Sequence, residues 1–164
     1  MRQIMIDVHR CNGCLTCTLA CASAHSLSQS IVGAMQEKTP SRIQVLSAKG
    51  KVVPLMCRHC EEPACVVACM SGAMKKDSKT GVVTNEGTGQ SCVGCWMCIM
   101  ACPYGAIKQH PTEKTALKCD RCSHREVPAC VEACHEKALS FVEVNEYANK
   151  REKKAAASLV DEQG

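Results

Sequence analysis

The pattern of apolar and polar positions predicts short strands joined by turns. Residues 4–8, which read Ile-Met-Ile-Asp-Val, and residues 140–144, which read Ser-Phe-Val-Glu-Val, have the composition of strands, and the two could pair across the fold. Residues 74–84 place the turn sequence Asp-Ser-Lys-Thr-Gly ahead of two valines, which is typical of a hairpin. Apolar residues also flank the sequence Ala-Lys-Gly-Lys at 48–51, so a second hairpin is predicted there. Such small elements indicate an α+β fold.

A repeated feature divides the chain. An alanine followed by an apolar residue marks the start of a strand in three places, at Ala73, Ala106 and Ala138. The segment 22–56 lacks this feature and carries the second predicted hairpin, so we interpret it as an insertion. Residues 145–164 contain a Glu–Lys pair four residues apart and three consecutive alanines, which favours an exposed or docked helix, or else a frayed tail.

Composition leaves little material for a conventional core. Among 164 residues there are one Phe, one Trp and two Tyr, whereas sixteen residues are cysteines. Something other than aromatic packing must order such a backbone, and the cysteines are the candidates. The N-terminal sequence has no apolar signal region, so we expect a cytoplasmic protein in which disulfides are disfavoured. No apolar run approaches the roughly 18 residues of a membrane-spanning helix, so we expect no direct membrane span.

The cysteines fall into four groups of four with a repeated spacing. In every group two residues separate the first two cysteines and three separate the last two, while the middle gap is two, four, two and seven residues in turn. The groups are Cys11, Cys14, Cys17 and Cys21; Cys57, Cys60, Cys65 and Cys69; Cys92, Cys95, Cys98 and Cys102; and Cys119, Cys122, Cys130 and Cys134. In the bacterial ferredoxin run, three cysteines of one loop bind one cluster and the fourth binds a neighbouring cluster. We therefore expect four 4Fe–4S clusters arranged in pairs, with the fourth cysteine of each group beginning a short helix.

Zinc is the main alternative to iron–sulfur clusters. Four zinc sites of four cysteines each would use the same residues. However, zinc sites usually join two separated cysteine pairs, and three cysteines at three-residue intervals in one loop suit a cubane better.

The formal charge of +4 is no argument for a nucleic-acid partner. That value counts every thiol as neutral. With thiolate ligands and a charge of about −2 per cluster, the loaded protein would carry about −4. We expect no nucleic acid among its partners.

Three cysteine groups resemble those of a known family. The segments CRHCEEPACVVAC, CVGCWMCIMACPYGAI and KCDRCSHREVPACVEAC are similar to the second, third and fourth cysteine groups of four-cluster electron-transfer subunits of the dimethyl-sulfoxide-reductase type. The resemblance covers residues 4–144. It implies single-electron transfer without catalytic chemistry on this chain, with a catalytic oxidoreductase subunit and a second redox protein as partners. Short cytoplasmic members, which serve carbon monoxide dehydrogenases, formate dehydrogenases, hydrogenases or tungsten aldehyde oxidoreductases, are the most similar in length.

The resemblance also implies an exchange of ligands between the groups. The sets are site 1, with Cys11, Cys14, Cys17 and Cys134; site 2, with Cys119, Cys122, Cys130 and Cys21; site 3, with Cys57, Cys60, Cys65 and Cys102; and site 4, with Cys92, Cys95, Cys98 and Cys69. Two ferredoxin-like modules of two clusters each are implied. The outer module comprises residues 1–21 and 103–144 and the inner module residues 57–102, with the insertion at 22–56 and a C-terminal helix or tail at 145–164.

Three functions remain open on the sequence alone. They are a dedicated electron-transfer subunit of a redox complex, a freely diffusing polyferredoxin, and a zinc-binding scaffold or accessory protein. No glycine-rich nucleotide loop and no paired acid and base are present, which leaves substrate chemistry to a partner. A helical segment at 145–164 would also allow higher-order assembly. His59 and His124 lie close to cluster cysteines, where ordinary solvated or capping roles are the simpler interpretation.

Overall fold

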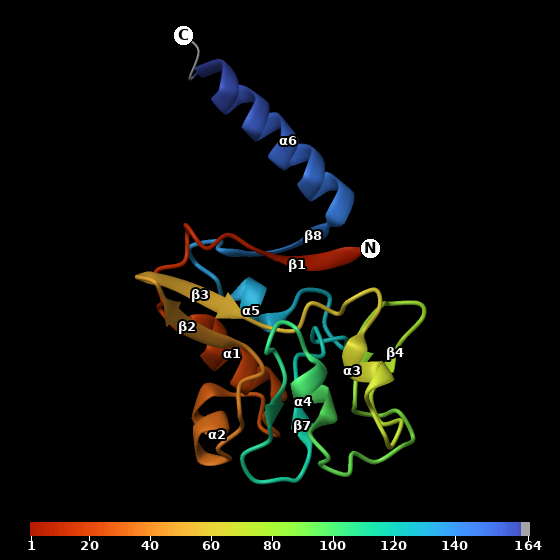
Figure 1. The fold of residues 1–164 in the computed structure, drawn as a ribbon. Coiled ribbons are helices and arrows are strands. Elements are labelled where there is room, and N and C mark those ends of the chain that lie inside the picture. Colours follow the sequence, from red (N-terminus) through yellow and green to blue (C-terminus); the bar gives the residue numbers. More distant parts are fainter. Residues whose placement is uncertain (162–164) are drawn as a thin grey trace.

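The computed structural model describes residues 1–161, which form a body of short strands and helices from which one long helix projects (Figure 1). Strands β1 (Arg2–Ile6) and β8 (Leu139–Glu143) pair antiparallel, with Ile4 opposite Phe141. The predicted pairing is confirmed, although each strand begins one or two residues earlier than the apolar pattern indicated.

Both predicted hairpins are present, and a third was missed. Strands β2 (Gln44–Ala48) and β3 (Lys51–Leu55) form the hairpin of the insertion, and β4 (Lys75–Lys76) pairs with β5 (Val83–Thr84). The third hairpin joins β6 (Lys108–Gln109) to β7 (Ala116–Leu117). Its strands have two residues each, too few to produce a recognisable alternation in the sequence.

One expectation about the helices is wrong. The third cysteine of each group, and not the fourth, lies in the first turn of a helix. These helices are α1 (Thr16–His25), α3 (Ala64–Val67), α4 (Met97–Ala101) and α5 (Ala129–Glu132). The fourth cysteine follows four residues later, within α1 or just beyond the end of the other three helices. Four residues make about one helical turn, so the two cysteines lie on the same helix face at different heights and can serve two different sites.

The insertion contains a helix that the sequence did not reveal. Helix α2 (Ile31–Gln36) is capped by the Ser30 hydroxyl, which accepts a hydrogen bond from the Gly33 amide at 3.0 Å. Glu37 accepts hydrogen bonds from the Leu27 and Ser28 amides at 2.7 and 3.1 Å. The loop that leads out of α1 is therefore tied to the end of α2.

Two hydrophobic clusters make up the core, and cysteines are part of both. The first contains Ile4, Cys17, Cys21, Ile43, Met56, Cys119, Cys130 and Leu139. The second contains Cys65, Met74, Val83, Cys98, Ile107 and Ala116. With so few large apolar side chains in either cluster, groups held by the cysteines must contribute to the stability of the body.

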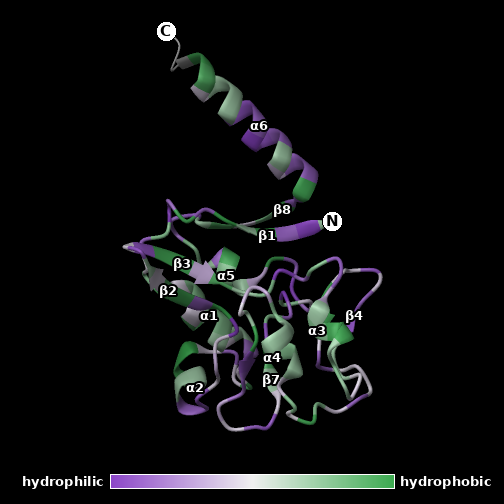
Figure 2. Ribbon diagram, in the orientation of Figure 1, coloured by the Kyte–Doolittle hydropathy of each residue, from purple (hydrophilic) through white to green (hydrophobic). Residues whose placement is uncertain are grey.

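Helix α6 (Val144–Asp161) follows β8 directly and extends away from the body (Figure 1). The predicted C-terminal helix is thus confirmed over this range. Hydrophobic residues occur at its two ends and hydrophilic residues along its middle (Figure 2). All side chains at 151–160 are exposed.

Candidate metal centres

Site 1 lies between the first cysteine group and the end of α5. One cavity is lined by Cys11, Cys14, Cys17 and Cys134. Its apolar walls include Val45 and Pro54 from the β2–β3 hairpin, and Leu139 from β8. The structure thus brings together three cysteines of one loop and one cysteine from a distant group.

Sites 3 and 4 repeat this arrangement in the other half of the body. One cavity is lined by Cys57, Cys60, Cys65 and Cys102 and is closed by side chains that include Val83 and Ile107. Another is lined by Cys69, Cys92, Cys95 and Cys98 and is closed by side chains that include Met74 and Trp96. In each cavity the fourth cysteine comes from the other inner group.

Site 2 is the most deeply buried of the four. Cys21, Cys119, Cys122 and Cys130 all have relative exposures of 8% or less. The Cys130 thiol lies close enough to Cys119, Cys21 and Cys122 for their charges to raise its pKa, in addition to the larger effect of its burial. The predicted members of all four sites therefore lie near one another.

The loop between the first two cysteines shares one backbone feature in every group. The residue before the second cysteine has a positive φ in all four, with values of +77° at Gly13, +48° at His59, +67° at Gly94 and +60° at Arg121. This turn directs amides at sulfur, since the His59 and Arg121 amides donate to Cys57 Sγ and Cys119 Sγ at 3.4 and 3.3 Å. At Gly94 a Cβ would lie 2.6 Å from the Lys114 carbonyl oxygen, so a side chain is excluded there.

Several thiols of these sites resist ionisation on their own, whereas at Cys14, Cys21 and Cys69 hydrogen bonds to sulfur outweigh burial and lower the pKa. Burial, and then the charges of Cys134, Cys14 and Cys11, raise the pKa of the Cys17 thiol to about 11. Burial raises the pKa of the Cys65 thiol to about 11 and that of the Cys119 thiol to about 12. Four thiolates in one place require a cationic centre, and four convergent sulfurs match the four irons of a 4Fe–4S cubane. The cysteines are free of disulfides, so the residues present fit this group.

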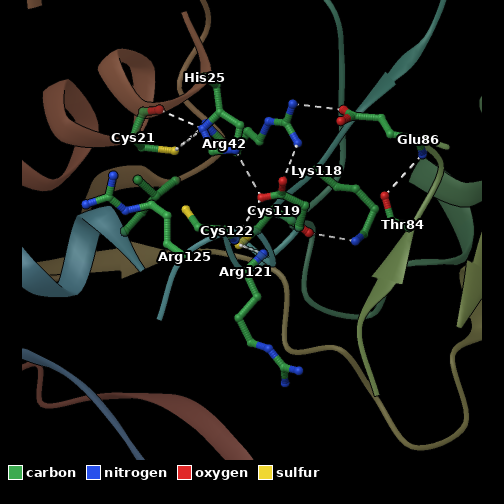
Figure 3. A network of polar contacts seen from close by, with 12 residues as sticks. Cys21, His25, Arg42, Thr84, Glu86, Lys118, Cys119, Arg121, Cys122 and Arg125 are labelled. Carbon is green, nitrogen blue, oxygen red and sulfur yellow. Dashed lines mark hydrogen bonds and ion pairs between the residues drawn. The ribbon is translucent and has the colours of Figure 1, made fainter. Parts of the chain in front are cut away.

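A network of ion pairs adjoins site 2 and was not predicted from the sequence (Figure 3). His25 Nδ1 lies 2.7 Å from the Cys21 carbonyl oxygen, and His25 Nε2 lies 3.1 Å from Asp120 Oδ1. Arg42 contacts Asp120 at 3.3 Å and Glu86 at 2.8 Å, and its amide donates to Cys21 Sγ at 3.3 Å. Burial opposes a charge on His25, but its bonds to Asp120 and Cys21 outweigh that effect and raise its pKa to about 10. The network links α1, the insertion and the fourth cysteine group.

Residues 48–144 match the family model of the 4Fe-4S dicluster domain. This range includes three of the four cysteine groups and more than half of the chain. This protein belongs to the 4Fe-4S dicluster family.

Relatives of this dicluster protein extend the similarity beyond residues 48–144. The B chain of the anaerobic dimethyl sulfoxide reductase of Escherichia coli K12 is 37% identical, over 93% of this chain and 78% of that protein. The electron transport protein HydN of the same strain is 34% identical over 88% and 89%, and an iron-sulfur protein of Rhodospirillum rubrum is 35% identical over 88% and 83%. Among solved structures, the active site complex BamBC of benzoyl coenzyme A reductase contains a chain that aligns over 98% of this one and 97% of itself. The alignment has a TM-score of 0.48 and 22% identity, which is too distant to support an assignment.

These findings establish the cofactor and the class of function. The dicluster protein carries four 4Fe–4S clusters and transfers electrons, and it belongs with the electron-transfer chains rather than the catalytic subunits of reductases. None of the helices in residues 1–161 is both long and apolar enough to cross a membrane.

Proposed function

We propose that this dicluster protein is the electron-transfer subunit of an oxidoreductase complex, linking a catalytic subunit of the carbon monoxide dehydrogenase, formate dehydrogenase, hydrogenase or aldehyde oxidoreductase type to a second redox protein. The observation that carries this function is the convergence of cysteines from two groups on each of three cavities. Bound 4Fe–4S clusters supply one-electron carriers whose potentials depend on local charge, hydrogen bonds to sulfur and exposure, over roughly −700 to +450 mV. The names of relatives, a reductase chain and an electron transport protein, support a partner that performs the substrate chemistry.

The ligands in this proposal are the four sets given above, with the fourth cysteine exchanged between groups. Sites 1 and 2 make up the outer module, and sites 3 and 4 the inner module. Ile107 and Ala116 pack in the second hydrophobic cluster, with Cys65 and Cys98. We therefore place the change from inner to outer module near Lys118 rather than at residue 103.

The four sites form one row in this proposal. The charge of Cys17 in site 1 acts on Cys130 in site 2. Cys57 of site 3 packs against the first hydrophobic cluster, which includes Cys119 of site 2. Helices α3 and α4, which carry cysteines of sites 3 and 4, contact each other. Sites 1 and 4 are therefore the ends, and the exposed Cys14 makes site 1 accessible to a partner.

Metal analysis tests the cofactor and the count of sites. Anaerobically purified protein should contain about sixteen irons and as many acid-labile sulfides per chain, and dithionite should produce interacting S = 1/2 signals in electron paramagnetic resonance (EPR). About four zinc ions per chain and no EPR signal would instead identify the zinc-binding scaffold.

Single substitutions test the exchange of ligands. Cys69 belongs to the second group by sequence but to site 4 by proposal, together with Cys92. We expect Cys69→Ser to change the same EPR signal as Cys92→Ser and to leave the signal changed by Cys65→Ser intact. The reverse result, in which Cys69→Ser matches Cys65→Ser, would assign each group to its own cluster.

Purification from the native source separates the subunit from a freely diffusing polyferredoxin. A subunit should copurify in fixed stoichiometry with a catalytic oxidoreductase chain, whereas a polyferredoxin should elute alone.

The proposal also includes a cytoplasmic location, which cell fractionation tests. It also includes higher-order assembly through the C-terminal segment: deleting residues 145–164 should lower the mass of the complex without loss of iron, and an unchanged mass would contradict that role.

A further inference from the structure

Two buried cations lie where the inner and outer parts of the body meet. Lys118 is 3% exposed and Arg121 is 9% exposed. Lys118 follows β7 and immediately precedes Cys119 of site 2. Figure 3 shows Lys118, Cys119, Arg121 and Cys122 close together, next to the network that contains Arg42.

Lys118 bridges site 2 and site 3 through its hydrogen bonds. Its Nζ donates to the carbonyl oxygen of Cys119, in site 2, at 2.7 Å. It also donates to the carbonyl oxygen of Val83, a fully buried residue that lines the cavity of site 3. The charge of Lys118 acts on Cys65 as well as on Cys119 and lowers the pKa of both thiols against the larger effect of burial. One cation is thus shared by the two central sites.

The described part of the chain provides no carboxylate partner for either cation. Within residues 1–161, no Asp or Glu forms an ion pair with Lys118 or Arg121. The guanidinium of Arg121 donates instead to the carbonyl oxygens of Arg2, at 3.1 Å, and Thr80. The nearest carboxylate in sequence, Asp120, is paired with His25 and Arg42. Burying an unpaired charge is strongly unfavourable, so a negative group must balance these cations when the protein is loaded.

A buried histidine, His59, contacts the same residue, Val83, to which Lys118 donates. It is 2% exposed, and its Nδ1 accepts a hydrogen bond from the Val83 amide at 3.0 Å, which places its proton on Nε2. An imidazole carries no negative charge, so His59 does not compensate the two cations.

We propose that Lys118 is a redox-tuning residue of the electron path, whose fixed positive charge makes the clusters of sites 2 and 3 easier to reduce. This inference rests on the proposed function, because it requires a cluster in each of these sites. One-electron reduction changes the charge of a cluster with four thiolates from about −2 to about −3. A cation stabilises the more negative state, and it does so most effectively where solvent is excluded. Since Lys118 is shared by sites 2 and 3, it favours an electron at the centre of the row over its ends.

The test is a redox titration of the loaded protein, followed by EPR, for the wild type and for variants of Lys118. Lys118→Met removes the charge with little change in length, and Lys118→Arg keeps the charge. Lys137→Met is the matched control, because Lys137 is exposed and close in sequence to Cys134 of site 1. We expect Lys118→Met to lower the reduction equilibrium constants of sites 2 and 3 by about tenfold, or about 59 mV for a one-electron couple, in both low and high salt. Sites 1 and 4 should shift much less, and the other two variants should titrate like the wild type.

The outcomes separate the two proposals. A wild type without about sixteen irons would overturn the proposed function itself. If the wild type and Lys118→Met both keep four clusters but all four potentials stay the same or shift equally, the role of Lys118 is wrong and the proposed function stands.

If Lys118→Met does not assemble, Lys118→Gln supplies the neutral comparison, because its amide can still donate to a carbonyl. Loss of the site 2 and 3 clusters from both neutral variants, but not from Lys118→Arg, would still support a charge acting on these clusters. Their loss from Lys118→Arg as well would show that the shape of the lysine matters rather than its charge.

Discussion

The proposed sites 1 and 2 are neighbours built from the same residue type, yet they differ in their access to solvent. In site 1 Cys14 is exposed and Cys11 and Cys134 are half-buried, whereas all four cysteines of site 2 are buried. Water can stabilise charge at site 1. At site 2 the protein must do so, with amides directed at sulfur, with the Asp120 network and with Lys118. We expect this difference in solvent access between a cluster at the end of an electron path and one in its middle.

The broadest way to test this comparison is to remove the metal. Because cysteines belong to both hydrophobic clusters, we expect loss of iron to unfold residues 1–143 cooperatively, as in other proteins whose folding is coupled to metal binding. A chelator with a mild oxidant should take iron from site 1 first and from site 2 last. Iron release and circular dichroism, followed together, measure this order. Release from site 2 before site 1 would mean that burial does not set the access of reagents.

Single ligand substitutions should separate the two sites next. Cys130→Ser places a hydroxyl among buried thiolates, and we expect it to lose about four of the sixteen irons and to melt well below the wild type. Cys14→Ser leaves an exposed oxygen that water can assist, so it should keep most of its iron and melt close to the wild type. Iron content and thermal melting under anaerobic conditions are the measurements. If the two variants lost equal amounts of iron and thermal stability, the difference in burial between the two sites would have no effect on cluster binding.

The ion-pair network beside site 2 provides a smaller effect. Arg42→Met leaves the buried Asp120 carboxylate without one of its partners, and we expect it to reduce the free energy of unfolding by about 3–5 kcal/mol. Glu86→Gln removes the exposed partner of the same arginine and should reduce it by less than about 1 kcal/mol. Urea midpoints of the loaded protein, measured anaerobically, compare the two. Similar values for both variants would indicate that the whole network is solvated.

The smallest expected effect lies in the loop that leads from α1 to α2. The amides of Leu27 and then Ser28, which donate to the Glu37 carboxylate, hold its pKa below its usual value. The carboxylate therefore stabilises this loop above its unfolded pKa, and the stabilisation is lost as the pH falls through the lower folded pKa. Amide exchange of residues 26–30 should accelerate relative to that of α1 as the pH falls from about 6 to about 3. In Glu37→Gln this acceleration should be absent and the iron content unchanged. Acceleration of equal size in the variant would assign the effect to another group.

Much of this molecule could be predicted from local sequence. The spacing of the cysteines indicated the cofactor, and short apolar runs indicated the β1–β8 pair and two of the three hairpins, because these features depend on neighbouring residues. The helices were predicted to begin at the fourth cysteine of each group but begin just before the third. The cysteine spacing alone does not show where a helix of four or five residues begins.

The polar contacts between distant segments could not be predicted. Lys118 and Arg121 look like ordinary surface residues in the sequence, beside cysteines that were already assigned. Their burial, and the contacts of Arg121 with Arg2 and Thr80, depend on how the two halves of the body meet. The same holds for His25 and Asp120, which lie far apart in the chain. Only the tertiary structure brings such residues together.

The pairing of the first strand with the last has a consequence for synthesis on the ribosome. β1 emerges first but finds its partner, β8, only when nearly the whole chain has been translated. The segment between them that contains β4, α4 and β7 can fold earlier, because its hydrophobic cluster draws only on residues 65–116. In a nascent chain the second hydrophobic cluster would thus fold before β1 pairs with β8. If synthesis stopped between these steps, the N-terminal cysteines would remain exposed.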